Sequence, residues 1–247
     1  MDIDSITLRG LIYYFLTLPF IQKVAAAFFS TEIPSPLGVA HVPIKTSDSI
    51  KSAILFGIYE HPERYLISKF LPRDKDVLEL GSSLGIVTRS ILKLLAPGRR
   101  VVSLDANIDL KDFWDLNVSK YLKSSRQAIL ENCLIAYSNA AGFIYGPDSL
   151  SGRASQSGPV KRVRNTSLQQ VLKQFSFHDE FSLIIDIEGM EYMVLAQESD
   201  LVRRAAFVCV EMHGSEEETL AFLKSMRQLG FFLLEQKHAV YAWAKSP

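Results

Sequence analysis

The chain is poor in the residues that mark several large classes of protein. Only two cysteines occur in 247 residues, Cys133 and Cys209, and each lies in an apolar run. We expect buried free thiols rather than a disulfide, which indicates an intracellular, cytoplasmic protein. Cysteines and histidines form no cluster with the spacing of a zinc site. Lys and Arg together number 27, as do Asp and Glu, so no basic excess indicates nucleic-acid binding.

The chain also lacks an uninterrupted apolar run of the roughly 20 residues that a membrane-spanning helix requires. The nearest candidate, residues 11–21, is interrupted by Pro19 and continued by residues 24–29. Acidic residues precede it, so it has no basic start typical of a signal peptide. We expect residues 1–48 to be a helical extension and linker that packs on the main domain or on a second subunit. A helix on a membrane surface is the alternative.

Short apolar runs alternate with helical patterns through residues 49–247, which we expect to form one domain. Five runs are expected to be core strands: residues 77–80, 100–104, 132–137, 181–186 and 205–211. Two further strands, 231–234 and 239–243, should form a closing antiparallel hairpin. Alternation of this kind predicts an α/β fold with a seven-stranded, mostly parallel sheet and helices on both faces. Residues 146–158, rich in Gly and Ser, are expected to be a mobile loop beside the site.

A glycine turn follows the first expected strand. Gly81 and Gly85 stand four residues apart, and apolar residues at helical spacing follow them. Gly81 allows a sharp turn, and Gly85 leaves room for a ligand or for a closely packed helix. The spacing differs from the G-x-G-x-x-G of dinucleotide-binding folds, and Glu79 would repel a diphosphate, which disfavours a nicotinamide enzyme. A carboxylate here suits a cofactor with an ammonium group, such as the methionine part of S-adenosylmethionine.

Acidic residues and a histidine follow three of the other expected strands. Asp105 ends the second strand, where a carboxylate can accept hydrogen bonds from ribose hydroxyls. Asp186 and Glu188 follow the fourth strand, and His213 follows the fifth. These side chains can converge because ligands bind beyond the carboxyl ends of such strands, which lie about 4.8 Å apart. Glu191, which follows Glu188 closely, is interpreted as the first residue of a helix, where a carboxylate interacts favourably with the helix dipole.

Several motifs together resemble the FkbM family of S-adenosylmethionine-dependent methyltransferases, over roughly residues 50–215. They are F-G-I-Y-E at 56–60, E-L-G-S-S-L-G at 79–85, D-A-N at 105–107, T-S-L at 166–168 and I-D-I-E-G-M-E at 185–191. The commoner family form has D-V-G-A-N-x-G and an E-P pair, and both departures keep the charge. The resemblance implies a class I, Rossmann-like methyltransferase fold and methylation of hydroxyls on sugars or small secondary metabolites.

The resemblance also implies which residues contact S-adenosylmethionine. The methionine end would lie against the turn, the ribose against the second strand, and the adenine after the third. The expected cofactor-binding residues are Glu79, Gly81, Ser82, Ser83, Gly85, Asp105, Ala106, Asn107, Ser138, Asn139 and Asp186. Asp186, Glu188 and His213 are the candidate catalytic residues, one of them acting as the general base. No metal ligand is assigned, and a divalent ion held by Asp186 and Glu188 stays an open alternative.

The leading hypothesis is therefore methyl transfer to a hydroxyl of a small molecule, with no nucleic-acid partner. A homodimer formed through the N-terminal helix is also considered. One alternative is N-methylation of a small molecule or peptide, which needs only a neutral amine. The other is a binding module that keeps the fold without catalysis, although Glu79 and Asp105 together favour cofactor binding.

Overall fold

The computed structural model describes residues 18–122, 127–137, 142–145, 150, 152–155, 161–178 and 180–245. The chain divides into two compact units, residues 1–61 and residues 62–247. Helix α3 (Asp48–Leu55) belongs to the first unit, and the expected start of the cofactor-binding domain at residue 49 stays a prediction.

The first unit contains two helices and a short hairpin. Its elements are α2 (Pro19–Phe28), β1 (Glu32–Ile33), β2 (Ala40–His41) and α3. Pro19 begins α2 rather than interrupting a helix, because proline fits the first helical turn. Helix α2 packs on α3, while Phe20 and Phe28 remain 74% and 78% exposed. Contact of this segment with a membrane surface or a second subunit stays a prediction.

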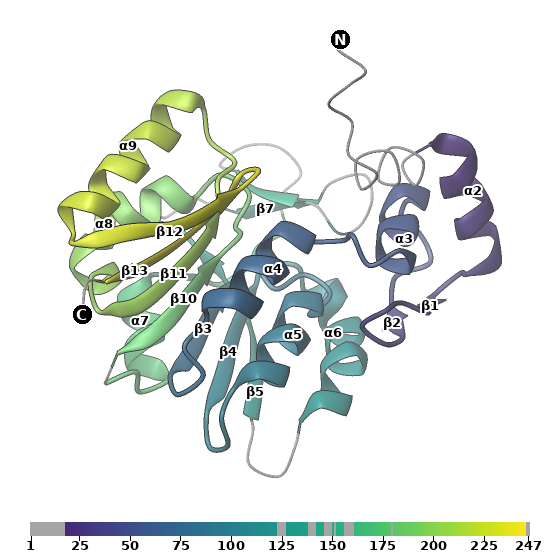
Figure 1. Ribbon diagram of the computed structural model, residues 1–247, viewed down its shortest axis with the longest axis horizontal. Coiled ribbons are helices and arrows are strands. Elements are labelled where there is room, and N and C mark those ends of the chain that lie inside the picture. The colour runs from purple at the N-terminus through teal and green to yellow at the C-terminus, as the bar shows by residue number, and fades with distance from the viewer. Residues whose placement is uncertain are drawn as a thin grey trace. The chain divides into compact units, whose positions relative to one another are not determined.

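A seven-stranded sheet organises the second unit. Its strands are β3 (Asp76–Leu80), β4 (Arg100–Asp105), β5 (Gln127–Asn132), β10 (Phe181–Ile185), β11 (Ala205–Glu211), β12 (Phe231–Lys237) and β13 (Val240–Lys245). The order is β12-β13-β11-β10-β3-β4-β5 (Figure 1). Strand β13 runs antiparallel to β11 and β12, and the other neighbours are parallel. The predicted seven-stranded sheet with its closing hairpin is confirmed.

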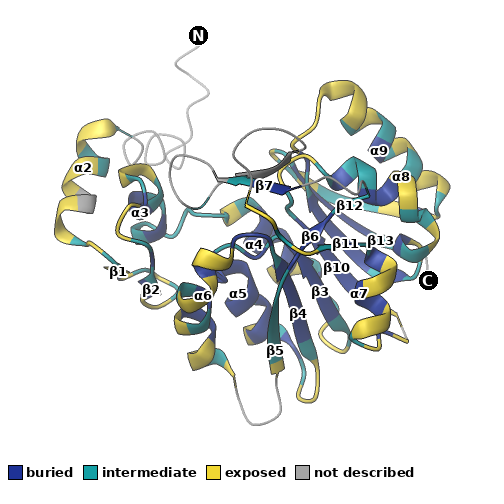
Figure 2. Ribbon diagram, turned by 180° about the vertical axis from the view of Figure 1, so that it is seen from behind, coloured by how far each residue is buried: buried dark blue, intermediate teal, exposed yellow. Residues whose placement is uncertain are grey.

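Helices cover both faces of this sheet (Figure 1). They are α4 (His61–Phe70), α5 (Ile86–Leu94) and α6 (Lys111–Val118) on one face, and α7 (Leu168–Gln174), α8 (Glu191–Val202) and α9 (Glu216–Gln228) on the other. Side chains alternate along each strand, so Val77 joins the core under α4 and α5 whereas Leu78 and Leu80 join the core under α7 and α8. The strands between the two layers are largely buried, as Figure 2 shows.

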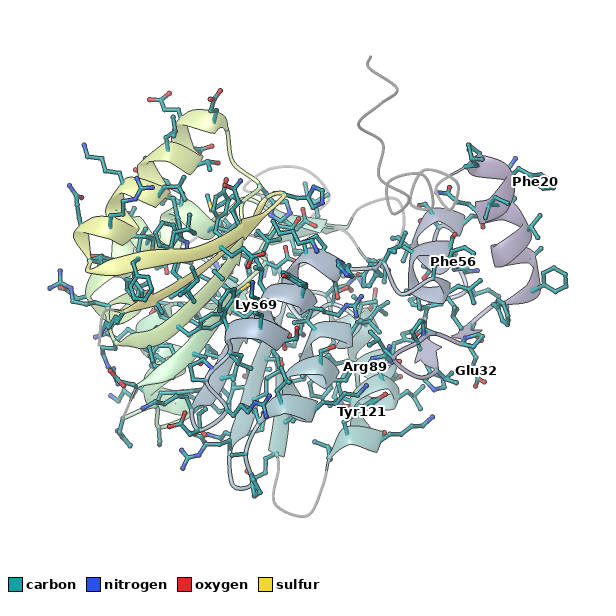
Figure 3. All side chains as sticks on the ribbon, viewed as in Figure 1. Phe20, Glu32, Phe56, Lys69, Arg89 and Tyr121 are labelled. Atoms are coloured by element: carbon teal, nitrogen blue, oxygen red, sulfur yellow. The ribbon has the colours of Figure 1, made fainter. Side chains whose placement is uncertain are left out.

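Helices α5 and α6 also hold each other through an aromatic ring. The 3-10 turn after α6, η3 (Ser119–Tyr121), brings Tyr121 toward α5. The guanidinium of Arg89 lies 6.0 Å from the centre of the Tyr121 ring (Figure 3), and the Lys93 ammonium lies 4.9 Å from it. This packing fixes the helix that follows the glycine turn.

Two expectations about strands were wrong. The third core strand is β5 at 127–132, not 132–137, while β6 (Leu134–Ile135) pairs with β9 (Asn165–Thr166) in a separate small sheet. Strand β5 is the sheet's edge and only half buried, and its apolar run is only three residues long, 128–130. Within the expected loop 146–158, β8 (Gly152–Ser155) pairs with β7 (Gly142–Tyr145). Its small and polar residues gave no strand pattern, and most of that loop lies outside the described residues.

Two smaller expectations can be compared directly with the structure. Cys133 and Cys209 are both buried and unpaired, as predicted. Among the described helices, none combines the length and the apolar character needed to cross a membrane.

Candidate active site

The glycine turn between β3 and α5 lies against the end of β10. Gly81 has a φ of +83°, and its amide donates a hydrogen bond to the Leu104 carbonyl at 2.9 Å. A Cβ at Gly81 would lie 1.6 Å from the backbone oxygen of Asp186. No side chain fits there, because the chain leaving β10 touches the turn. The turn and the Asp186 segment are therefore parts of one site.

Gly85 serves helix packing. A Cβ on Gly85 would lie 2.8 Å from side-chain carbons of both Trp114 and Val118 on α6. The buried Asn117 side chain of the same helix donates a hydrogen bond to the Leu84 carbonyl at 2.9 Å. Of the two reasons considered for this glycine, a ligand or a close helix, the structure shows the close helix.

Asp105 binds the backbone of the glycine turn. Its Oδ2 accepts hydrogen bonds from the amides of Ser82 at 3.1 Å and Ser83 at 2.6 Å, and its Oδ1 accepts one from Asn107 at 2.7 Å. Burial raises the pKa of Asp105, and the three backbone hydrogen bonds offset part of that shift. A carboxylate has about four lone-pair positions. One therefore remains on Oδ1, and the predicted hydrogen bond from a ribose hydroxyl stays a prediction.

Glu79 is fully buried and links three elements. Its Oε2 accepts hydrogen bonds from Thr88 of α5 at 2.6 Å and from Ser103 of β4. Among the described residues, its Oε1 has no hydrogen-bond partner. Burial raises the pKa of Glu79 to about 7, although the two hydroxyls lower it in part. The predicted contact of Glu79 with the methionine end of the cofactor stays a prediction.

The remaining predicted cofactor residues at this edge are mostly buried. Ser82 is buried, and its hydroxyl has no partner in the described part of the chain. Ala106 and Asn107 are also buried, and the Asn107 side chain accepts a hydrogen bond from the Asp109 amide at 3.2 Å. The unpaired Ser82 hydroxyl and the remaining lone pair of Asp105 each suit a ligand rich in hydroxyl and amino groups, as the adenosyl and methionine parts are.

The expected adenine contacts, Ser138 and Asn139, lie outside the described residues. The register places Asn132 opposite Asp105, and the Asn132 side chain donates a hydrogen bond to the Asp105 carbonyl at 2.9 Å. Asn132 ends the third strand beside Asp105 and was not among the predicted site residues. A polar residue at the end of a half-buried edge strand gives almost no sequence signal.

The structure brings the three candidate catalytic residues together. His213 Nε2 lies 3.8 Å from Asp186 Oδ1 and 4.0 Å from Glu188 Oε2. It also lies 4.0 Å from Oε1 of Glu211, the last residue of β11. Glu211 was missed, although its position two residues before His213 places both on one side of an extended chain.

Glu191 was interpreted too narrowly as a helix opener. It is the first residue of α8, but its side chain is 1% exposed and its Oε1 lies 3.0 Å from His213 Nδ1. The same oxygen accepts hydrogen bonds from the amides of Ile187 and Gly189. Burial raises the pKa of Glu191, but these hydrogen bonds outweigh it and the net pKa is lowered. Glu191 therefore fixes the orientation of the imidazole.

Burial and neighbouring charges shift the pKa values of Asp186, Glu211 and His213. Burial and the nearby Glu211 raise the pKa of Asp186 to about 8, and burial likewise raises the pKa of Glu211. The hydrogen bond to Glu191 raises the pKa of His213 to about 9. At neutral pH the imidazole therefore carries its proton and acts as a hydrogen-bond donor. A pKa near 8 also leaves Asp186 mostly protonated at neutral pH, so that carboxyl accepts a proton readily only once it has ionised.

The topology and the turn define a class of protein. The sheet order, the glycine turn after the central strand β3 and the carboxylate at the end of β4 are those of class I S-adenosylmethionine-dependent methyltransferases. The family model for the methyltransferase FkbM domain matches residues 87–233, more than half of the chain. The chain therefore belongs to the FkbM family of S-adenosylmethionine-dependent methyltransferases, and its cofactor is S-adenosylmethionine. The turn at 79–85 lies just before the matched segment.

Solved structures with a similar fold include three methyltransferases. The precorrin-6y C5,15-methyltransferase of Geobacter metallireducens is 14% identical, with a TM-score of 0.45, and the match covers 74% of this chain and 87% of that one. An O-methyltransferase of Bacillus cereus in complex with S-adenosylhomocysteine is 13% identical, with a TM-score of 0.43 and coverage of 74% and 80%. The ribosomal protein L11 methylase of Lactobacillus delbrueckii subsp. bulgaricus is 12% identical, with a TM-score of 0.43 and coverage of 75% and 77%. These similarities do not indicate an acceptor. No curated protein matches the chain.

Proposed function

We propose that the protein transfers the methyl group of S-adenosylmethionine to a hydroxyl oxygen of a small molecule, such as a sugar or a secondary metabolite. The observation that supports this proposal is the carboxylate cluster around His213, which adjoins the glycine turn through Asp186. A hydroxyl is a weak nucleophile until its proton leaves. Carboxylates beside the acceptor can take that proton, whereas a neutral amine would not need them.

The position of each residue in the site would determine its role in the reaction. Bound S-adenosylmethionine supplies a methyl group that is already reactive toward nucleophiles. Asp105 and the glycine turn hold the cofactor, which fixes the direction of attack. His213, as a charged donor, would hold the acceptor oxygen through Nε2. Glu188 would accept the hydroxyl proton, or Asp186 once it has ionised above neutral pH, and the half-exposed Glu188 can also bind neighbouring hydroxyls.

A small-molecule acceptor in the cytoplasm belongs to the same proposal. The equal numbers of acidic and basic residues support a small molecule over a nucleic acid. The two unpaired cysteines support a reducing compartment.

The test is transfer of a deuterated methyl group from S-adenosylmethionine to a pool of sugars, amino sugars and phenols, with the product located by mass spectrometry. We expect the label on oxygen. Glu188→Gln and Asp186→Asn should lower turnover by about 100-fold or more, as loss of a general base does. Their affinity for S-adenosylhomocysteine should change little. Glu180→Gln, just before the amino end of β10, is the matched control and should behave as the wild type.

Three results would contradict the proposal. Label on nitrogen would indicate N-methylation. A Glu188→Gln variant that lost cofactor affinity would place Glu188 in the cofactor site instead of the acceptor site. If S-adenosylhomocysteine did not raise the melting temperature, the chain would be a binding module of another kind.

A further inference from the structure

We propose that Asp186, Glu211 and His213 bind one divalent metal cation at the carboxyl edge of β10 and β11. One ligand atom from each of the three side chains lies within 4.8 Å of the others. Ligand atoms around one cation, with bonds of about 2.1 Å, lie about 3 to 4.2 Å apart. Small shifts of the two half-buried carboxylates would therefore complete the site. Metal binding does not depend on the identity of the acceptor.

The distances from His213 Nε2 suit a shared cation better than hydrogen bonds. They are 3.8 Å to Asp186 and 4.0 Å to Glu211, whereas a hydrogen bond from nitrogen to oxygen spans about 2.7 to 3.2 Å. In the part of the chain that the structure describes, neither of these two carboxylates accepts a hydrogen bond. A cation between Nε2 and the two carboxylates would bring all three within bonding distance of one partner.

The contact between Glu191 and His213 Nδ1 distinguishes the proposed metal site from an ordinary acidic surface. His213 Nδ1 is engaged by the buried Glu191 carboxylate at 3.0 Å, and the amides of Ile187 and Gly189 hold that carboxylate in place. Histidines that bind metals usually donate the other ring N–H to a carboxylate, which fixes the tautomer and the ring orientation. With the Nδ1 N–H donated to Glu191, Nε2 is the nitrogen that ligates once the cation has displaced its proton. The cation then holds the acceptor oxygen in place of the Nε2 donor.

The local charge also favours a cation. Asp186, Glu188, Glu191 and Glu211 surround one imidazole, and among the described residues no Lys or Arg forms an ion pair with any of them. The Asp186 and Glu211 side chains are only 24% and 32% exposed. Charges that are partly withdrawn from water require a partner of opposite sign. A divalent cation would offset two of these negative charges.

The three ligand atoms limit which metal ions the site can bind. One imidazole nitrogen with two carboxylates suits Mn²⁺, Fe²⁺ or Zn²⁺, because Mg²⁺ and Ca²⁺ favour oxygen ligands alone. A role for the metal in methyl transfer rests on the proposed function. A bound cation lowers the pKa of an oxygen that it ligates, so Glu188, which is outside the ligand set, could then take the proton of the acceptor hydroxyl.

The experiment titrates Mn²⁺, and separately Zn²⁺, into the full chain after EDTA treatment, without cofactor or acceptor. Calorimetry and the electron paramagnetic resonance of free Mn²⁺ give stoichiometry and affinity. We expect one cation per chain, bound at least about 10-fold more weakly by Glu211→Gln and His213→Asn. Glu180→Gln should bind as the wild type does. Because no methyl transfer is measured, failure of the proposed function would leave this result unchanged.

The metal site would be refuted if neither cation bound saturably, or if the ligand variants bound as tightly as Glu180→Gln. Binding of S-adenosylhomocysteine shows which variants are folded. If the variants do not fold, Mn²⁺ is added to the wild type and the imidazole signals are followed by NMR. Selective broadening of the His213 signal supports the site, and broadening confined to other histidines refutes it.

Discussion

Asp105 shows how one side chain can join the turn to its ligand. Three backbone amides hold its carboxylate between β4 and the glycine turn. The same carboxylate is the expected acceptor for the ribose hydroxyls. Its replacement should therefore affect both the shape of the turn and the affinity for the cofactor.

We predict that Asp105→Ala weakens S-adenosylmethionine binding by about 1–3 kcal/mol, because ribose hydroxyls and turn amides lose their acceptor. Isothermal titration calorimetry measures the affinity, and denaturant unfolding measures the accompanying loss of stability without cofactor. Asp109→Ala is the control, since Asp109 forms an exposed ion pair with Lys161. Unchanged cofactor affinity in Asp105→Ala would remove Asp105 from the ribose site.

Glu79 makes the stability of the fold depend on pH. Its pKa is about 7 in the folded protein and near 4.5 without burial, so the folded state binds the proton more tightly. Stability from this group is full below the lower value and is lost as the pH rises through about 7. The loss should amount to roughly 2–4 kcal/mol.

We predict that Glu79→Gln removes this loss, because the amide keeps an acceptor for Thr88 and Ser103 and cannot ionise. Urea unfolding at pH 5 and pH 8 should show a smaller difference in the variant than in the wild type. Equal pH dependence in both would contradict the assignment. Cofactor affinity measured alongside shows whether Glu79 also contacts the methionine end.

The site residues that the sequence predicted share a simple physical basis. Asp186, Glu188 and His213 follow buried strands, and the carboxyl ends of parallel strands meet at one edge, so their convergence could be expected. The role of Glu191 could not, because spacing does not show that a helix's first residue turns its carboxylate toward a neighbouring strand. Such orientation depends on the backbone around Glu188, where φ is +53°.

At the scale of elements, close contact with neighbouring parts of the chain explains both glycines of the turn. Gly81 admits the chain that leaves β10, and Gly85 admits α6. Strand, turn and helix were predictable from the apolar run and the glycine spacing. The third strand was not, because β5 has a neighbour on one side only and its apolar run is just three residues long, 128–130, with polar residues on both sides.

We predict that Gly85→Ala lowers the free energy of unfolding more than Gly98→Ala does. Both glycines have positive φ, +75° and +81°. A Cβ at Gly98 meets nothing within 4 Å, whereas one at Gly85 meets Trp114 and Val118 at 2.8 Å. Gly98→Ala should cost about 1 kcal/mol of backbone strain, and Gly85→Ala about 1–3 kcal/mol more for overpacking. Equal losses in urea unfolding would show that α6 adjusts without cost.

At the scale of the molecule, the order of the strands explains where the site lies. From the central strand β3 the chain continues to β4 and β5 on one side, and later to β10 and β11 on the other. Ligands of open α/β sheets bind where the order reverses in this way. The turn after β3 and the carboxylates after β10 lie on either side of that point, so the topology brings the proposed cofactor and acceptor groups together.

The central claim is that the cofactor on the glycine turn directs its methyl group at the cluster around His213. A crystal structure with S-adenosylhomocysteine tests it most directly. We predict the ribose hydroxyls on Asp105, the sulfur beside Gly81, and His213 Nε2 within about 10 Å of that sulfur, close enough for an acceptor to reach both. A sulfur pointing away from the cluster, with His213 farther off than this, would contradict the account.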